Sequence, residues 1–224
     1  MHICWSLILV VGIAMVFQSD GLAEEAIKLP PPVTKGGMAL TEALQARRTV
    51  RHFATRPLDL AQLSQLLWEA DGASDPQGHR TSPSAGATYP LNLYVVAGER
   101  GVANLPAGTY HYEIAAQALA PLARGDLRAV VARACLNQAW MTAAPVLIVI
   151  TGEYRRCTAR YGQRGIRYTH MEAGNVSQNL FLAAESLGLG AGIVGAFEDK
   201  ALAQVLKLPP AHEPLLVMPV GYKH

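Results

Sequence analysis

Three arginines lie within five residues of one another, and their spacing could bind a phosphate group. Arg47, Arg48 and Arg51 surround Thr49 and Val50 near the end of a short helical pattern. A guanidinium group is a fixed cation whose fork of N–H donors matches phosphate oxygens. Arg48 and Arg51 are three positions apart, so on a helix they could converge on one ligand. The alternative is a solvated helix end, where basic side chains interact favourably with the helix dipole.

Two stretches of small residues could let a flat ligand approach the backbone closely. The Gly-, Ser- and Pro-rich residues 73–88 include the sequence Pro83-Ser84-Ala85-Gly86. Residues 191–197 include Gly195 and Ala196, whose backbone N–H groups could face a ligand. Ordinary turns and structural glycines have the same composition, so by itself each stretch leaves both interpretations open.

The hydrophobic pattern around these stretches predicts both helices and strands. Helices are expected at 41–47 with Thr41 as cap, at 60–71 between Asp59 and Gly72, after Asp126, at 168–187 and at 199–206. Strands are expected at 91–97, in a hairpin over 109–122, at 145–151, at 215–220 and, as a strand or turn, at 190–197. Because helices and strands do not alternate strictly, an α+β fold is expected.

Composition limits the class of protein. The chain has 224 residues, half of them hydrophobic, which suits a single domain with a sizeable core. A net charge of +2 with 16% charged residues implies no large basic face, so nucleic acid is not an expected partner. No dinucleotide-binding or P-loop glycine motif follows a strand, and no His or Cys spacing suggests a metal site. Cys135 and Cys157 could form a disulfide, although two unlinked thiols are favoured.

The N-terminal residues suggest targeting. Residues 4–17 are nearly continuously apolar, and the small residues of 21–23 follow them. This pattern favours a cleaved signal peptide over 1–23, with an uncleaved anchor and a buried helix as alternatives. The expected location is therefore exported, periplasmic or extracellular, or else anchored to the membrane by this segment. Residues 24–37, with three consecutive prolines and a glycine pair, are predicted as a linker, and 38–224 as the folded domain.

Taken in order, the motifs resemble the nitroreductase superfamily. RRTVRHF, PSAGATYPLNLYVV and RYGQRGIRYTHMEAGNVSQNLFLAAESLGLGAGIVGAF follow one another within about residues 40–222. More narrowly, the chain is similar to the SagB-type branch of thiazole- and oxazole-forming azoline dehydrogenases. The resemblance implies a nitroreductase-like α+β fold with a mixed or antiparallel central sheet flanked by helices. It also implies a homodimer that binds FMN at its interface.

The resemblance assigns an FMN contact to each motif. The positions that match the phosphate- and ribityl-binding segment are Arg47, Arg48, Thr49 and Arg51. Those that match the segment beside the isoalloxazine ring, in part from the other subunit, are Pro83, Ser84, Ala85 and Gly86. The backbone N–H groups near the flavin N5 atom belong to Gly195 and Ala196. Gln138 is a candidate for the polar edge of the ring, and Lys223 for the phosphate.

The expected catalytic pair departs from the branch it resembles. Azoline dehydrogenases have a Lys-Tyr pair before the long helix, where this chain has Arg160 and Tyr161. Arginine keeps its proton and is a poor general base, which leaves Tyr161 as the candidate. Glu172, in the long helix, is expected to form a structural ion pair within reach of the arginine segment.

The expected activity is FMN-dependent hydride transfer with a small-molecule or peptide-borne substrate, as in a SagB-type dehydrogenase. One alternative is an NAD(P)H-dependent reductase of nitro compounds or quinones. Another is a flavin-binding protein that has lost catalysis.

Overall fold

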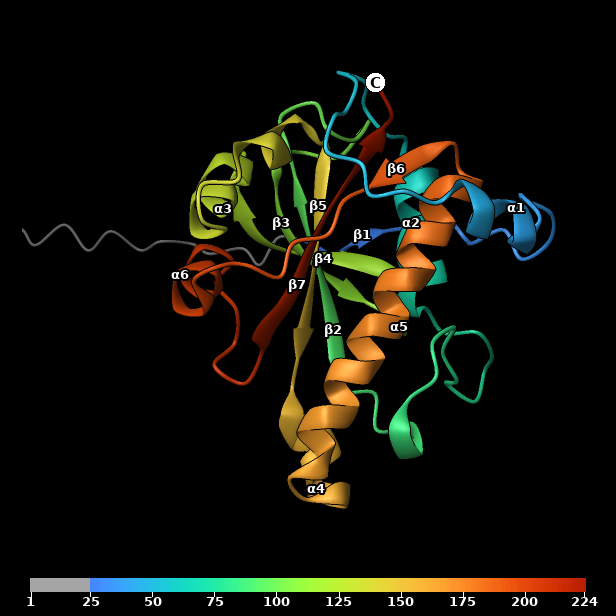
Figure 1. Ribbon diagram of the computed structural model, residues 1–224, viewed down its shortest axis with the longest axis vertical. Helices are drawn as coiled ribbons and strands as arrows, with labels where there is room; N and C mark the ends of the chain where they lie inside the picture. Colours follow the sequence, from blue (N-terminus) through green and yellow to red (C-terminus); the bar gives the residue numbers. More distant parts are fainter. Residues whose placement is uncertain (1–24) are drawn as a thin grey trace, which may run out of the picture.

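The computed structural model describes residues 25–224, in which a seven-stranded sheet has helices on both faces (Figure 1). The strands are β1 (Ile27–Lys28), β2 (Leu91–Ala97), β3 (Gly108–Glu113), β4 (Ala118–Arg124), β5 (Val146–Gly152), β6 (Leu189–Ala191) and β7 (Glu213–Tyr222). They lie in the order β1-β4-β3-β2-β5-β7-β6, and all neighbouring pairs are antiparallel. The predicted α+β class is confirmed. A mixed or antiparallel sheet was expected, and the sheet is antiparallel.

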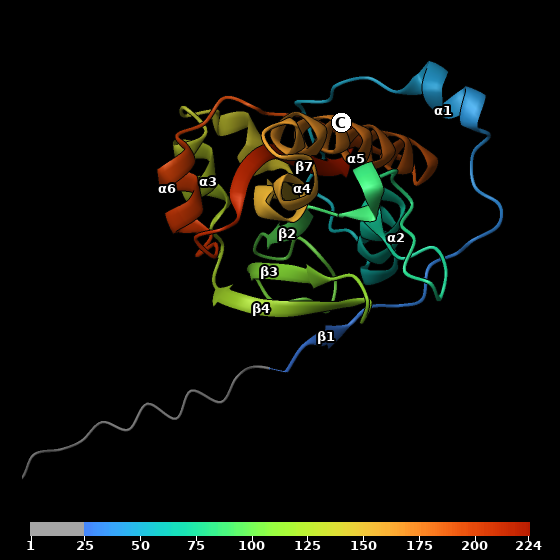
Figure 2. The same cartoon turned by 90° about the horizontal axis from the view of Figure 1, so that it is seen from below.

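The helices divide into two layers, one on each face of the sheet (Figure 2). They are α1 (Leu40–Ala46), α2 (Leu60–Asp71), α3 (Arg128–Ala134), α4 (Tyr154–Tyr161), α5 (Arg164–Ser186) and α6 (Asp199–Val205), with short 3-10 turns at Ala85–Ala87 and Ala139–Ala143. The helices α2 and α5 pack on one face, and α3 and α6 on the other. Each face therefore has its own hydrophobic core.

The two central strands are buried along their whole length. β2 and β5 pair over seven positions, from Leu91 opposite Gly152 to Ala97 opposite Val146. Because helices cover both faces, side chains on either side of these strands must be apolar. This explains why their sequences, LNLYVVA and VLIVITG, show no polar alternation.

The predicted start and end of α2 are confirmed in detail. The Asp59 carboxylate accepts a 2.7 Å hydrogen bond from the Gln62 N–H, and the Gln62 side-chain oxygen accepts one of 3.0 Å from the Asp59 N–H. This reciprocal capping box satisfies two N–H groups that the helix itself cannot. At the other end, the Gly72 N–H donates to Trp68 O over 2.8 Å.

Three helix predictions need correction at the N-terminal end. Ala39 is the N-cap of α1 and uses no side-chain cap, so Thr41 lies inside the first turn. Leu127 is the N-cap of α3, although the Asp126 carboxylate accepts from the Arg128 N–H over 3.1 Å. The long helix begins at Arg164 rather than Tyr168.

The helix α4 was not predicted. Its side chains are largely exposed and basic, and only Cys157 is buried. It therefore lacks the apolar stripe by which helices are recognised in a sequence. Its position depends on contact with α5, not on a hydrophobic face of its own.

The predicted location of the protein is wrong. No helix among residues 25–224 is long and apolar enough to cross a membrane. The predicted signal peptide, residues 1–23, lies outside the described residues, and nothing in residues 25–224 supports export. Part of the segment predicted as a linker contacts the domain: β1 pairs with β4, and the Ser64 hydroxyl donates to Pro30 O over 2.5 Å.

Neither cysteine among residues 25–224 forms a disulfide. Cys135 and Cys157 are both free and buried, as the favoured interpretation of the sequence held. Burial raises the pKa of the Cys135 thiol to about 11, so this thiol is unreactive near neutral pH. Within residues 25–224, no cluster of three or more His, Cys, Asp or Glu side chains could hold a metal ion.

Candidate functional site

The arginine segment lies directly beside the Gly-rich strand β6. The Val50 N–H donates a 2.8 Å hydrogen bond to Ala191 O, and Thr49 forms a parallel bridge with the same residue. Gly190 allows this approach, since a Cβ there would lie 2.7 Å from Val50 Cγ2. Two of the three motifs, far apart in the sequence, are thus brought together at the edge of the sheet.

Two of the three guanidinium groups of this segment contact aromatic rings. Arg47 lies 5.2 Å from the ring centroid of Phe181, and Arg51 lies 5.7 Å from that of Trp140. Arg48 donates 2.8 Å hydrogen bonds to the carbonyls of residues 45 and 47. Within residues 25–224 none of the three arginines pairs with a carboxylate. Their charge is therefore available to an anion.

Lys223 lies next to the arginine segment but has a partner of its own. A Cβ at Gly190 would approach Lys223 Cγ to 3.1 Å, which places this side chain beside Val50. Its ammonium group is 2.5 Å from the carboxylate of Glu185, which is almost fully buried. The positive charge of Lys223 is therefore largely compensated within the chain.

The turn after β6 presents two unused backbone donors. Val194 and Val217 exchange hydrogen bonds of 2.8 and 2.9 Å, which fixes the chain just before the turn. Gly195 and Ala196 follow and are exposed, and their N–H groups donate to no acceptor within residues 25–224. The Gln138 amide donates to Ala196 O over 3.3 Å, so this side chain orients the turn.

The PSAG loop, residues 83–86, lies against α4. The Arg160 guanidinium donates to Gly86 O over 2.9 Å. Gly86 has a φ of +58°, and a Cβ there would lie 2.3 Å from the Tyr161 hydroxyl oxygen. The ring of Tyr161 in turn meets Tyr168 edge-on, with centroids 5.3 Å apart. The predicted catalytic pair and the PSAG loop are therefore one local unit.

This unit and the arginine segment lie at different levels of α5. Arg47 contacts Phe181 near the C-terminal end of the helix, whereas the PSAG loop approaches Glu172 through Ser84. Nine helical positions correspond to about 13 Å along the axis. In Figure 1, α1 and β6 lie at one end of α5 and α4 at the other. Within one chain, the arginine segment and the PSAG loop therefore do not form a single site.

A buried carboxylate lies beneath the PSAG loop. Glu172 is 2% exposed, and neither carboxylate oxygen has a hydrogen-bond partner among residues 25–224. Burial raises the pKa of Glu172 to about 7, and the neighbouring Ser84 hydroxyl opposes this shift. The expected ion pair between Glu172 and the arginine segment is therefore wrong. The neighbouring carboxylate that does pair with an arginine is Asp71, which lies 2.6 Å from Arg80.

Sequence reasoning missed a polar cluster on the α5 face of the sheet. The Tyr154 hydroxyl lies 2.7 Å from His170 Nε2 and donates to Glu213 Oε1 over 3.3 Å. These residues border a cavity of about 470 Å³ that Gly195 and Phe197 also line. The three residues come from α4, α5 and β7, so no local motif in the sequence could reveal them.

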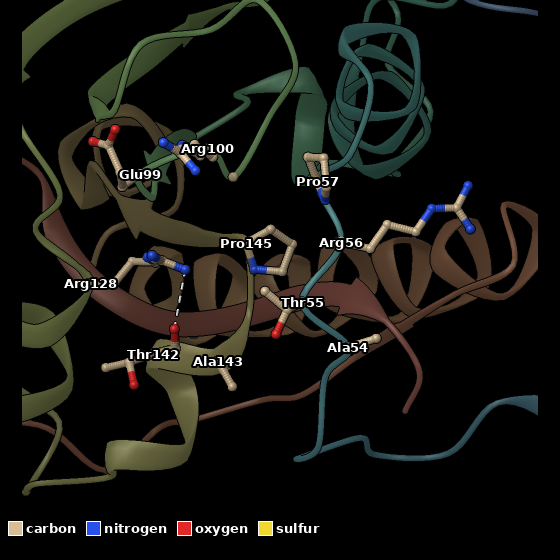
Figure 3. A pocket seen from close by; sticks show the side chains of 11 residues that line it. Ala54, Thr55, Arg56, Pro57, Glu99, Arg100, Arg128, Thr142, Ala143 and Pro145 are labelled. Carbon is tan, nitrogen blue, oxygen red and sulfur yellow. Dashed lines mark hydrogen bonds between the residues drawn. The ribbon is translucent and has the colours of Figure 1, made fainter.

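A second cavity, of about 420 Å³, lies away from these motifs and is a poorer candidate (Figure 3). Its most buried arginine, Arg128, is bound by the Asp126 carboxylate at 2.6 Å and by the carbonyls of Thr142 and Ala144. Arg56 points away from the cavity and covers the ring of Tyr222. The cavity is therefore a poorer candidate, because neither Arg128 nor Arg56 offers it a free guanidinium group.

Comparison with known proteins identifies the family. The family model described as Nitroreductase family matches residues 44–222. The chain belongs to the nitroreductase family. It is therefore an oxidoreductase of a family that is typically flavin-dependent.

The relatives include provisionally named nitroreductases and a microcin-processing protein. MJ1384 of Methanocaldococcus jannaschii, provisionally named a nitroreductase, is 42% identical over 82% of this chain and 91% of its own. The microcin B17-processing protein McbC of Escherichia coli is 28% identical over 67% of this chain, which spans 57% of McbC. A crystal structure of a provisionally named nitroreductase from Ralstonia eutropha has a TM-score of 0.77 and 28% identity, covering 91% of this chain and 92% of that one.

Proposed function

We propose that this protein is an FMN-dependent oxidoreductase that works as a homodimer and transfers hydride between the flavin N5 atom and a small organic substrate. The observation that carries the proposal is the contact between the arginine segment and strand β6. It puts three arginines without carboxylate partners beside Ala191, four residues before the two unused backbone N–H groups of Gly195 and Ala196. A flavin mononucleotide needs both: cations for its phosphate and donors for its ring.

The arginine segment fits the phosphate end of FMN. Phe181 and Trp140 hold Arg47 and Arg51 by their ring faces, which restricts the guanidinium groups without neutralising them. Arg48 still has N–H donors beyond the two carbonyl contacts it makes. These three side chains and the Thr49 hydroxyl would bind the phosphate and the adjoining ribityl chain.

The turn at Gly195 and Ala196 fits the ring end. Backbone N–H groups can orient N5 without offering it an exchangeable acid, which suits an atom that exchanges hydride. Gln138 would act by fixing the Ala196 peptide through its 3.3 Å hydrogen bond, and not by contacting the ring directly as expected. The bound FMN supplies the hydride exchange, and the protein supplies its orientation.

A second subunit would complete the site through α5. Gly174 lies near the middle of this helix on its exposed side, where a Cβ would have no atom within 4 Å, and Met171 nearby is 58% exposed. A glycine within a helix costs about 1 kcal/mol relative to alanine, which a close helix–helix approach would justify. A two-fold pair would bring the partner's PSAG loop, with Arg160 and Tyr161 bound to it, to the Gly195 turn.

Reduction of nitro compounds or quinones with NAD(P)H is the reaction class that we favour. Arg160 is engaged with Gly86 O, and its guanidinium group is a poor base for azoline oxidation. Azoline oxidation of the SagB type is the second candidate, supported by the similarity to McbC. Tyr161 would be the acid–base residue in that reaction. A flavin-binding protein without turnover is the third candidate.

The absorbance spectrum of the purified protein tests the cofactor. We expect a flavin band, and we expect Arg48→Ala and Arg51→Ala each to lower FMN affinity at least tenfold. Arg133→Ala, at an exposed position of α3, is the matched control. Unchanged flavin content in both site variants would refute the phosphate assignment, and a wild-type protein that binds no flavin would refute the function.

Turnover assays separate the reaction classes. NAD(P)H oxidation that depends on a quinone or nitroaromatic acceptor supports the favoured reductase. Reduction of the oxidised flavoprotein by an azoline peptide supports the second candidate. Bound flavin that reacts in neither direction supports the third.

A further inference from the structure

The cavity beside the Gly195 turn has apolar walls and one polar end. The walls include Ile193, Phe197, Leu215 and Leu216, and Gly195 lies among them. The polar end is formed by Tyr154, His170, Asp199 and Glu213. With about 470 Å³, the cavity can accommodate a flat aromatic molecule next to the proposed N5 donors.

Three elements hold the polar end in place. Tyr154 is the first residue of α4, His170 lies on α5, and Glu213 is the first residue of β7. The Tyr154 and His170 rings meet edge-on, with centroids 5.5 Å apart and planes at 83°. The Tyr154 hydroxyl lies 2.7 Å from His170 Nε2 and 3.3 Å from the Glu213 carboxylate. The phenol is therefore oriented from two sides.

The surroundings of Tyr154 keep its proton on the phenol oxygen. Partial burial, followed by the charges of Glu213 and Asp199, raises the pKa of Tyr154 to about 12. Near neutral pH the side chain is consequently a hydrogen-bond donor and a potential acid, not a base. The His170 ring adjoins the phenol at the same end of the cavity.

We propose that Tyr154, oriented by His170, donates a hydrogen bond and then a proton to a carbonyl oxygen of a quinone bound in this cavity. The assignment rests on the proposed function. A quinone becomes a hydroquinone when it gains a hydride from reduced flavin and one proton, and a nicotinamide nucleotide supplies the next hydride. The proton comes from the Tyr154 hydroxyl, and a proton from solvent replaces it through the adjoining His170 imidazole.

The role of Tyr154 differs from that expected of Tyr161. Tyr161 lies at the PSAG loop and would act at the partner's flavin, whereas Tyr154 lines the same cavity as its own chain's Gly195. The two tyrosines can therefore be distinguished by substitution. If quinone reduction uses Tyr154, Tyr161→Phe does not reproduce the effect of Tyr154→Phe.

The test compares Tyr154→Phe and His170→Gln with wild type, as full-length FMN-loaded protein. Tyr222→Phe is the control. It also removes a hydrogen-bonded hydroxyl, but that hydroxyl contacts Gln62, and Tyr222 does not line the cavity. The first measurement titrates the oxidised flavoprotein with hydroquinone and follows the flavin absorbance. We expect Tyr154→Phe to weaken binding at least fivefold, and Tyr222→Phe to leave it unchanged.

The second measurement mixes pre-reduced protein with p-benzoquinone over a range of pH. We expect Tyr154→Phe to slow flavin reoxidation at least tenfold and His170→Gln to change the pH profile while retaining hydroquinone binding. Wild-type affinity and rate in Tyr154→Phe would overturn the proposal, as would loss of FMN from this variant, since the phenol would then support the flavin site. A wild-type protein without flavin or turnover would instead refute the proposed function.

Discussion

The backbone of Val50 is hydrogen-bonded to that of Ala191, with the Val50 N–H donating to Ala191 O over 2.8 Å. Strand β6 is the edge of the sheet, so this bond adds the arginine segment to the sheet as a short continuation. The positions of Arg47 and Arg51 relative to the Gly195 turn are therefore set by a rigid sheet edge and not by a free loop.

Substitution of Gly190 tests this contact. In Gly190→Ala the new Cβ would lie 2.7 Å from Val50 Cγ2 and displace the arginine segment from β6. We expect FMN affinity, measured by fluorescence titration, to fall about tenfold, which corresponds to about 1.4 kcal/mol. The double variant Gly190→Ala/Val50→Ala removes the closest contact, leaves Val50 Cβ and Lys223 Cγ at 3.1 Å, and should recover most of the affinity. Equal loss in the single and double variants would contradict the steric argument.

The proposed interface is tested at Gly174. Leucine at this exposed helical position would prevent the close approach of a second α5, while the surrounding space in one chain accommodates it. We expect light scattering to show that Gly174→Leu shifts the protein from dimer to monomer. Gln204→Leu, at an exposed position of α6, is the control for added surface hydrophobicity. A dimeric Gly174→Leu variant would exclude this face of α5.

The buried Glu172 predicts a pH dependence of stability. Burial raises the pKa of Glu172 from 4.5 to about 7, so between these values the folded state holds a proton that the unfolded state has lost. The stabilisation from this proton is complete below about pH 4.5 and is lost as the pH rises through 7. Glutamine stays neutral, so Glu172→Gln should gain roughly 3 kcal/mol in unfolding free energy relative to wild type between pH 4.5 and pH 8.

Urea unfolding at several pH values measures this difference. Glu25→Gln, at an exposed carboxylate near the start of the described chain, is the control and should show no such trend. A constant difference between Glu172→Gln and wild type across the pH range would mean that Glu172 titrates like an ordinary carboxyl group.

The capping box of α2 predicts a stability effect that leaves the site intact. Asp59→Ala removes the acceptor for the Gln62 N–H and the reciprocal bond, which should cost about 1 kcal/mol. For a domain of this size, that lowers Tm by about 2–4 °C. Asp59→Ser keeps an acceptor and should recover most of the loss in a thermal melt, with FMN content unchanged in both variants.

Much of the fold could be predicted where local signals are strong. The Asp59 cap, the leucine stripe and Gly72 defined α2, and the uninterrupted apolar residues of β2 and β5 indicated buried strands. The helix α4 could not be predicted, because exposed basic residues carry no periodic apolar signal. The beginning of α5 was missed for the same reason.

The sequence by itself determined the chemistry that the protein can offer: clustered arginines, a small-residue loop and a Gly-rich turn, in an order that indicates the nitroreductase family. Tertiary structure decided which of these meet. A backbone hydrogen bond at the edge of the sheet joins Val50 to Ala191. The PSAG loop lies nearer the N-terminal end of α5 than the arginine segment does. The burial of Glu172 and the meeting of Tyr154 with His170 also depend on packing between distant elements. Side-chain types are local properties of a chain, whereas distances and desolvation exist only once the elements have packed.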